Sequence, residues 1–113
     1  MNVTTEQAGA VSIVRVGETR LMYPLLSDFS AAVGGLVASG RREILIDLAQ
    51  VTYVDSATIG CLMDLYRQIH GVGGHLKLSG VQKRVETMLT LTGAQNFIEI
   101  HPDEPSAVKS FGG

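Results

Sequence analysis

The stretch between Glu43 and Ile69 constrains the fold most, because an apolar run, a polar turn and a long amphipathic pattern follow one another in it without interruption. Residues 44–48 read Ile-Leu-Ile-Asp-Leu and are rich in branched apolar side chains. Such a run is typical of a strand that is covered on both faces in a largely parallel sheet. We therefore predict a central, buried strand over these five residues.

A helix is predicted directly after the polar corner at residues 55–58. Beyond that corner, apolar residues recur at the three- and four-residue steps of one helix face, at Ile59, Leu62, Met63, Tyr66 and Ile69. Asp55 and Ser56 therefore lie between strand and helix, where an Asp or Ser oxygen accepts the free amide protons of the first helical turn. One interpretation of this pair is simply a helix cap.

The remaining pattern alternates strands and helices. We predict an optional strand over residues 2–7, strands at 10–16, 75–79 and 97–100, and helices at 24–40, 81–93 and 107–111, with a glycine turn at 71–74. The strand at 75–79 alternates polar and apolar residues, so we expect it to have one wetter face. Such alternation indicates an α/β fold, with a mostly parallel central sheet of four to five strands and about four helices. The prediction is one domain over residues 1–113, with its core at about 8–111.

Composition argues against several classes of protein. With 113 residues, 45% apolar residues and a net charge of -2, the chain is long enough for a core and a poor candidate for binding nucleic acid. Cys61 is the only cysteine and lies on the apolar helix, which predicts a buried, inert thiol without an internal disulfide. No leader pattern and no apolar run of about 20 residues occurs, so we expect a cytoplasmic protein that does not enter a membrane.

Sites for catalysis, cofactors and metals are weakly supported. Ser56 beside Asp55 allows a small serine hydrolase, yet the G-x-S-x-G pattern is missing. No phosphate-binding G-x-x-x-x-G-K-[ST] loop occurs, and no Cys/His or acidic set has the spacing of a zinc or calcium site. We therefore expect no cofactor, no metal and no enzymatic activity, and we keep the hydrolase as an alternative.

What remains is a hydroxyl at the start of a helix, which is suited to be the substrate of a kinase. A phosphate on Ser56 would face free backbone amides and the positive end of the helix dipole. The fold would tolerate the modification, whereas a partner lying over the corner would feel an added charge of roughly -1.5 to -2.

The motifs quoted above resemble the STAS domain, and within it the bacterial anti-sigma factor antagonists. The hallmark of these proteins is Asp-Ser-[Ser/Ala/Thr]-Gly-Leu-Gly after an apolar strand, and it is matched here by Asp55, Ser56, Ala57, Ile59 and Gly60. The resemblance implies that Ser56 is the phosphoacceptor of a serine/threonine kinase that is also the anti-sigma factor. It further implies a serine phosphatase that reverses the modification, and partner binding around Asp55, Ala57, Thr58, Ile59 and Gly60.

Two departures from the family pattern stand out. Thr58 replaces the usual Gly, which is expected to add a branched side chain and a second hydroxyl to an exposed first turn. Residues 17–22 lack the G-x-[LI]-D pattern of the family, so contacts expected from that loop are not carried over. A scaffold or transport-associated STAS subunit that does not cycle through phosphate is the alternative within the family, and a homodimer is left open.

Overall fold

A computed structural model describes residues 1–112 of the chain. The strands are β1 (Val3–Ala8), β2 (Val11–Val16), β3 (Arg20–Leu21), β4 (Glu43–Asp47), β5 (Tyr53–Val54), β6 (His75–Ser79) and β7 (Glu99–His101). The α-helices are α1 (Leu26–Ala38), α2 (Ser56–Gly71), α3 (Lys83–Thr92) and α4 (Glu104–Phe111). Two short 3₁₀ turns, η1 (Tyr23–Leu25) and η2 (Ala94–Asn96), precede α1 and β7.

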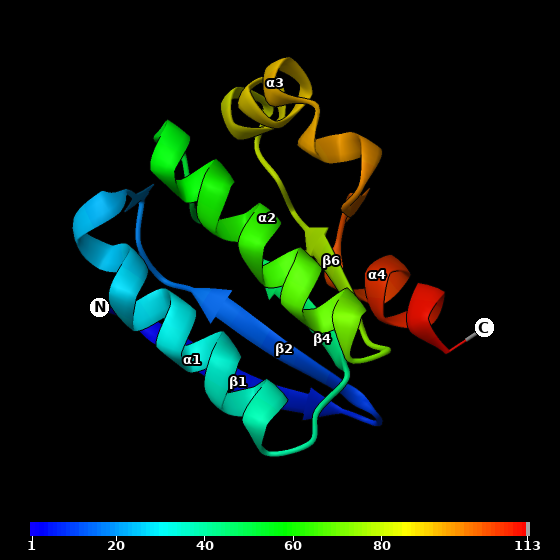
Figure 1. Ribbon diagram of the computed structural model, residues 1–113. Coiled ribbons are helices and arrows are strands. Elements are labelled where there is room, and N and C mark those ends of the chain that lie inside the picture. The colour runs from blue at the N-terminus through cyan, green and yellow to red at the C-terminus, as the bar shows by residue number, and fades with distance from the viewer. Residues whose placement is uncertain (113) are drawn as a thin grey trace.

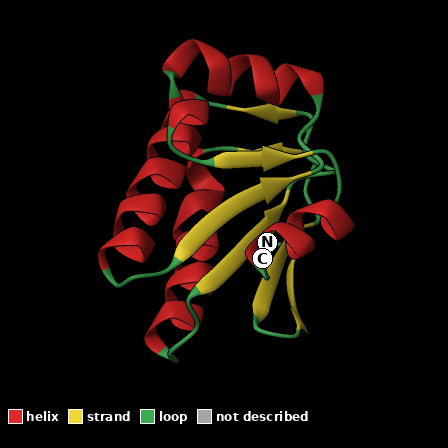
Figure 2. Ribbon diagram, turned by 90° about the vertical axis from the view of Figure 1, so that its right-hand side faces the viewer, coloured by secondary structure: helices red, strands yellow, loops and turns green. Residues whose placement is uncertain are grey.

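The predicted α/β sheet is confirmed. Five strands lie in the order β1-β2-β4-β6-β7, with β4 in the centre (Figures 1 and 2). Only β1 is antiparallel to its neighbour, and every other pair in this sheet is parallel. The sequence pattern did not predict β3 and β5, which form a separate parallel pair of two residues each. Runs of two residues are too short to carry a readable alternation.

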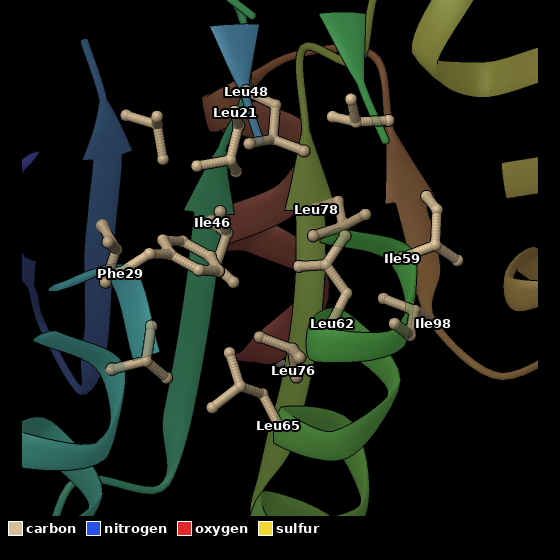
Figure 3. Packing of buried hydrophobic residues seen from close by; sticks show 14 of the residues in the cluster. Leu21, Phe29, Ile46, Leu48, Ile59, Leu62, Leu65, Leu76, Leu78 and Ile98 are labelled. Carbon is tan, nitrogen blue, oxygen red and sulfur yellow. The ribbon is translucent and has the colours of Figure 1, made fainter. Parts of the chain in front are cut away.

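The central strand is buried on both faces, as predicted. Ile44 and Ile46 are completely buried in the larger apolar cluster, on the side that faces α1 and α2. Figure 3 shows Ile46 in this cluster, with Phe29 of α1 and Leu62 of α2. Leu45 points to the other side, where it is equally buried beside Ala107 of α4. Figure 2 shows α1 and α2 on one side of the sheet and α4 on the other. The polar corner at residues 55–58 therefore belongs to the α1/α2 side.

The prediction of a wetter face on β6 is wrong. Lys77 is only 9% exposed and Ser79 is completely buried. The Lys77 ammonium donates to Ser110 Oγ at 2.9 Å and lies 4.7 Å from the centre of the Phe111 ring, both on α4. A long, amphipathic lysine side chain can run beneath a helix in this way because its stem is apolar. The alternation of polar residues in β6 therefore marks the face covered by α4.

Some boundaries and one burial state differ from the predictions. Pro24 lies in η1, so α1 begins only at Leu26, and β7 starts at Glu99 because η2 and an exposed Phe97 precede it. Cys61 is partly exposed and was wrongly expected to be buried. Its Sγ lies 3.3 Å from Ser30 Oγ of α1, so the thiol lies between the two helices.

Candidate functional site at the start of helix α2

The corner before α2 is formed by one carboxylate that caps the helix. Asp55 has extended backbone angles and is the N-cap of α2. Its Oδ1 accepts a hydrogen bond from the Thr58 amide at 2.9 Å. Ser56 is the first helical residue and makes no capping hydrogen bond. The interpretation of this pair as a helix cap is therefore confirmed for Asp55 and wrong for Ser56, because Asp55 already satisfies the amide that a cap would serve.

The same carboxylate ties α2 to the chain before α1. Asp55 Oδ2 accepts from the Tyr23 backbone amide at 2.9 Å. The Thr58 hydroxyl oxygen lies 2.7 Å from both the Leu21 carbonyl oxygen and Asp55 Oδ1, so two acceptors compete for its single proton. Asp55 and Thr58 thus join three segments at one point: the end of β3, the start of η1 and the first turn of α2.

The predicted site residues divide into exposed and buried side chains. Ser56, Ala57 and Gly60 are exposed on the first turns of α2, and Asp55 is partly exposed beside them. Thr58 is completely buried and Ile59 is 4% exposed. The expectation that Thr58 adds a hydroxyl to an exposed surface is therefore wrong, since its hydroxyl points inward to Leu21. Ser56 is the exposed hydroxyl among the residues predicted for the site.

The hydrogen bonds around Asp55 favour its charged form. Partial burial works to raise the pKa of Asp55, but hydrogen bonds from the Thr58 hydroxyl, the Tyr23 amide and the Thr58 amide outweigh it. The net result is a pKa below the ordinary value for Asp. The group next to Ser56 is therefore a carboxylate at neutral pH. A phosphate on Ser56 would add negative charge directly beside it.

The serine hydrolase alternative gains no support from the histidines. His70 lies 14 residues after Ser56 on the same helix, which is about 21 Å at 1.5 Å per residue. His75 Nδ1 lies 3.0 Å from Glu43 Oε2, and His101 Nε2 lies 2.9 Å from Glu99 Oε1. Within residues 1–112, no histidine is hydrogen-bonded to Ser56. A general base is thus not placed on this hydroxyl.

Three side chains near the corner were not predicted for the site. Tyr23 is 73% exposed, although its amide is fixed on Asp55. In the small β3–β5 sheet Arg20 is paired with Tyr53, and the Arg20 guanidinium carbon lies 5.3 Å from the centre of the Tyr53 ring. Only the pairing of β3 with β5 brings Arg20 beside the corner, and no local pattern in the sequence signals that pairing.

Two hollows of the surface lie away from this corner. One cavity of about 190 Å³ lies between the end of α2, the start of β6 and Phe97, and another of about 250 Å³ lies between the β1–β2 turn and α4. Neither is lined by a residue of the corner. Within the described part of the chain, no cluster of His, Cys, Asp and Glu suits a metal ion, and no helix is long and apolar enough to cross a membrane.

Comparison with known proteins matches both the sequence and the fold. The chain is 30% identical over 77 residues to the anti-sigma-B factor antagonist of Bacillus subtilis, covering 68% of this chain and 65% of that protein. The match spans just under two thirds of the length of the curated relatives. A crystal structure of an anti-sigma factor antagonist from Mycobacterium paratuberculosis superposes with a TM-score of 0.87 at 20% identity, covering 96% of this chain and 92% of the other.

A second similar structure is that of a phosphorylated protein. SpoIIAA, a cell fate determinant of Bacillus, was solved in its phosphorylated form and superposes with a TM-score of 0.75 at 14% identity, covering 97% of this chain and 99% of the other. At such identities these two structures support the fold alone. The family model described as "STAS domain" matches residues 2–107, almost the whole chain. This chain therefore belongs to the STAS domain family.

Proposed function

We propose that this protein is an anti-sigma factor antagonist that is switched by phosphorylation of Ser56. The unmodified chain binds an anti-sigma serine/threonine kinase and so frees a sigma factor, and phosphorylation of Ser56 releases the kinase. The observation that carries this proposal is the position of Ser56, an exposed hydroxyl at the first residue of α2 with no capping role. The names of the curated relatives support the antagonist role.

The geometry of the corner favours a switch that acts at the surface. Asp55 already caps α2, so modification of Ser56 does not remove a hydrogen bond that the fold needs. A phosphate at this position is close to the helix N-terminus, which stabilises negative charge. The phosphate would instead weaken binding of the partner, because two negative groups, Asp55 and phosphoserine, would then face any surface bound there.

The remaining parts of the cycle follow from this proposal. A serine phosphatase restores the binding form, and the chain itself is a kinase substrate and not an enzyme. Because the partners act on transcription, the cycle takes place in the cytoplasm. Ala57 and Gly60, which are exposed next to Ser56, contact the kinase in the complex. Thr58 and Ile59 are buried and hold this part of α2 in place.

The test uses purified candidate anti-sigma kinases from the source organism, each incubated with the full chain and ATP. Intact-mass analysis should detect a gain of one phosphoryl group in the wild type. The Ser56→Ala variant should gain none, because the Thr58 hydroxyl is buried. The Ser56→Asp variant should bind the kinase more weakly than the wild type, while Ser56→Ala should stay bound when ATP is present. Both variants should melt within a few degrees of the wild type, because Asp55 supplies the cap.

Other outcomes separate the alternatives. A kinase that binds Ser56→Asp and the wild type equally would contradict the switch and favour a scaffold or transport-associated STAS subunit. An acyl adduct on Ser56 after treatment with a reactive ester would favour the hydrolase. A gain of one phosphoryl group in the Ser56→Ala variant would show that another residue is the phosphoacceptor.

A further inference from the structure

Tyr23 is an exposed aromatic residue whose position is fixed beside the switch serine. It is 73% exposed, although tyrosine rings are usually at least partly buried. Its backbone amide donates to Asp55 Oδ2 at 2.9 Å, and Pro24 follows it in η1. The carboxylate that precedes Ser56 therefore holds the segment that displays this ring. An exposed ring on a fixed backbone loses little conformational entropy when a partner covers it.

Arg20 adds an available positive charge next to the same corner. Its guanidinium lies over the Tyr53 ring, with 5.3 Å between the guanidinium carbon and the ring centre. Within residues 1–112, no carboxylate lies within ion-pair distance of Arg20. This cation–π contact holds the guanidinium beside the ring, and its N–H groups can donate to an incoming acceptor. A partner with a carboxylate at this place would complement the charge.

We propose, on the basis of the function proposed above, that Arg20, Tyr23 and Tyr53 form a docking patch that selects the anti-sigma kinase. The face of the kinase that fits this patch has an apolar recess for the Tyr23 ring and an Asp or Glu at its border that binds Arg20. Tyrosine and arginine are the residue types that most often dominate the binding energy of protein interfaces. Of these residues, Arg20 lies within residues 17–22, where the chain departs from its family pattern, and Tyr23 follows that segment at the start of η1.

The patch also gives a physical reason for release on phosphorylation. The kinase carboxylate that Arg20 attracts would approach the corner where Asp55 is charged. A phosphate on Ser56 adds roughly -1.5 to -2 charges there and opposes the attraction by Arg20. The same acidic group on the kinase is thus attracted by Arg20 before phosphorylation and repelled by the phosphate on Ser56 after it.

The experiment is a titration of the full chain with the kinase that binds the wild type in the assay above. We expect Tyr23→Ala to raise Kd at least tenfold and Tyr23→Phe to raise it less than threefold, because the ring fills the recess. Arg20→Glu should also raise Kd at least tenfold, and the difference from the wild type should shrink in high salt. Melting temperatures should stay near that of the wild type, since these side chains are exposed.

Two matched variants control for general surface effects. Phe97→Ala removes an aromatic ring that is 59% exposed and packs near Tyr66, ten residues along α2 from Ser56. Arg41→Glu reverses an exposed charge just before the start of β4, whereas the corner follows the end of β5. Neither should change Kd more than twofold.

The outcomes distinguish this inference from the proposed function. If Tyr23→Ala and Arg20→Glu bind like the wild type while Ser56→Asp binds weakly, the docking patch is wrong and the switch stands. If the controls weaken binding as much as the patch variants, the patch is likewise overturned. If no kinase binds or phosphorylates the wild type, the proposed function fails and the inference falls with it.

Discussion

Asp55 decides the local structure around Ser56, because each of its carboxylate oxygens holds a different segment. Oδ1 accepts from Thr58 and fixes the first turn of α2, and Oδ2 accepts from Tyr23 and fixes the start of η1. Hydrogen bonds to a charged acceptor are stronger than those between neutral groups. Ser56, between these anchored residues, is therefore presented on a rigid backbone although its own side chain has no structural role.

The charge of Asp55 should make stability depend on pH. Its pKa is lowered on folding, so its contribution is fully present above the ordinary Asp pKa of about 3.9 and is lost as pH falls through the lower folded pKa. Asp55→Asn keeps an acceptor oxygen but lacks the charge, so its melting temperature should fall less than that of the wild type in this acidic range. Calorimetry from pH 7 down to about pH 3 measures the difference. Parallel curves for the two proteins would contradict the assignment.

Thr58 should matter for stability and not for phosphorylation. Thr58→Val keeps the shape but removes the hydroxyl that lies 2.7 Å from the buried Leu21 carbonyl oxygen. An unsatisfied buried acceptor costs about 1–3 kcal/mol, so this variant should melt earlier, whereas Thr58→Ser should lose less. Both variants should still accept phosphate at Ser56. Equal melting temperatures of Thr58→Val and the wild type would show that the Thr58 hydroxyl does not contribute to stability.

At this scale the sequence predicts the corner at residues 55–60, but neither the role of each residue there nor the residues that reach it from β3 and η1. Asp and Ser are both favoured at N-caps, so the sequence preference could not assign the cap to Asp55 over Ser56. The burial of Thr58 depends on Leu21, which reaches it only through the pairing of β3 with β5. Interactions between residues 37 positions apart leave no trace in a local pattern.

Elements were more predictable than residue roles, because burial on both faces leaves a strong signature. The run at β4 predicted its central position, and its apolar residues are buried on both sides. The face of β6 was misread because polar residues usually mark solvent, but Lys77 and Ser79 are buried and α4 covers Lys77. The contact between Lys77 and Ser110 of α4 joins residues that are 33 positions apart, so no local pattern predicts it.

A charge in the centre of β4 should abolish the fold. Leu45 is completely buried on the α4 side, so Leu45→Asp would bury a carboxylate in an apolar cluster. The ammonium of its neighbour on β6, Lys77, is already bound to Ser110 and paired with Glu99. We expect a loss beyond about 4 kcal/mol, enough to remove the cooperative thermal transition. Leu91→Asp is the matched control, because Leu91 is 78% exposed on α3. A cooperative melt of Leu45→Asp at the wild-type temperature would contradict the central position of β4.

On the scale of the whole molecule, the two sides of the sheet have separate tasks. The α1/α2 side holds the larger apolar cluster and presents the corner that carries Ser56. The other side is covered by α4, whose start is held by Arg15 of β2: Nε and Nη2 donate to the two carboxylate oxygens of Glu104, each at 2.7 Å. Arg15 also donates to Glu6 at 2.8 Å. One guanidinium thus links the edge strand, the sheet and the last helix.

Removal of the Arg15 guanidinium should change how the stability of the protein depends on pH. Burial, with the nearby Glu104 carboxyl, raises the pKa of Asp47, while the Arg15 hydrogen bond lowers that of Glu104. In Arg15→Met the carboxyls of Glu6, Asp47 and Glu104 repel one another without a cation, so we expect a loss of about 1–2 kcal/mol at pH 7. A raised folded pKa means that protonation favours the folded state, so acidification should stabilise the variant relative to the wild type.

Calorimetric melting of the wild type and Arg15→Met between pH 7 and about pH 4.5 tests this, with Arg41→Met as the control for loss of an exposed arginine. The gap in melting temperature between Arg15→Met and the wild type should narrow as the pH falls, while Arg41→Met should follow the wild type throughout. Phosphorylation of Ser56 by the kinase should proceed at the wild-type rate in Arg15→Met at 25 °C, because α4 and the corner lie on opposite sides of the sheet (Figure 2). A gap that widens on acidification would contradict the raised pKa of Asp47, and a changed phosphorylation rate would contradict the separation of the two sides.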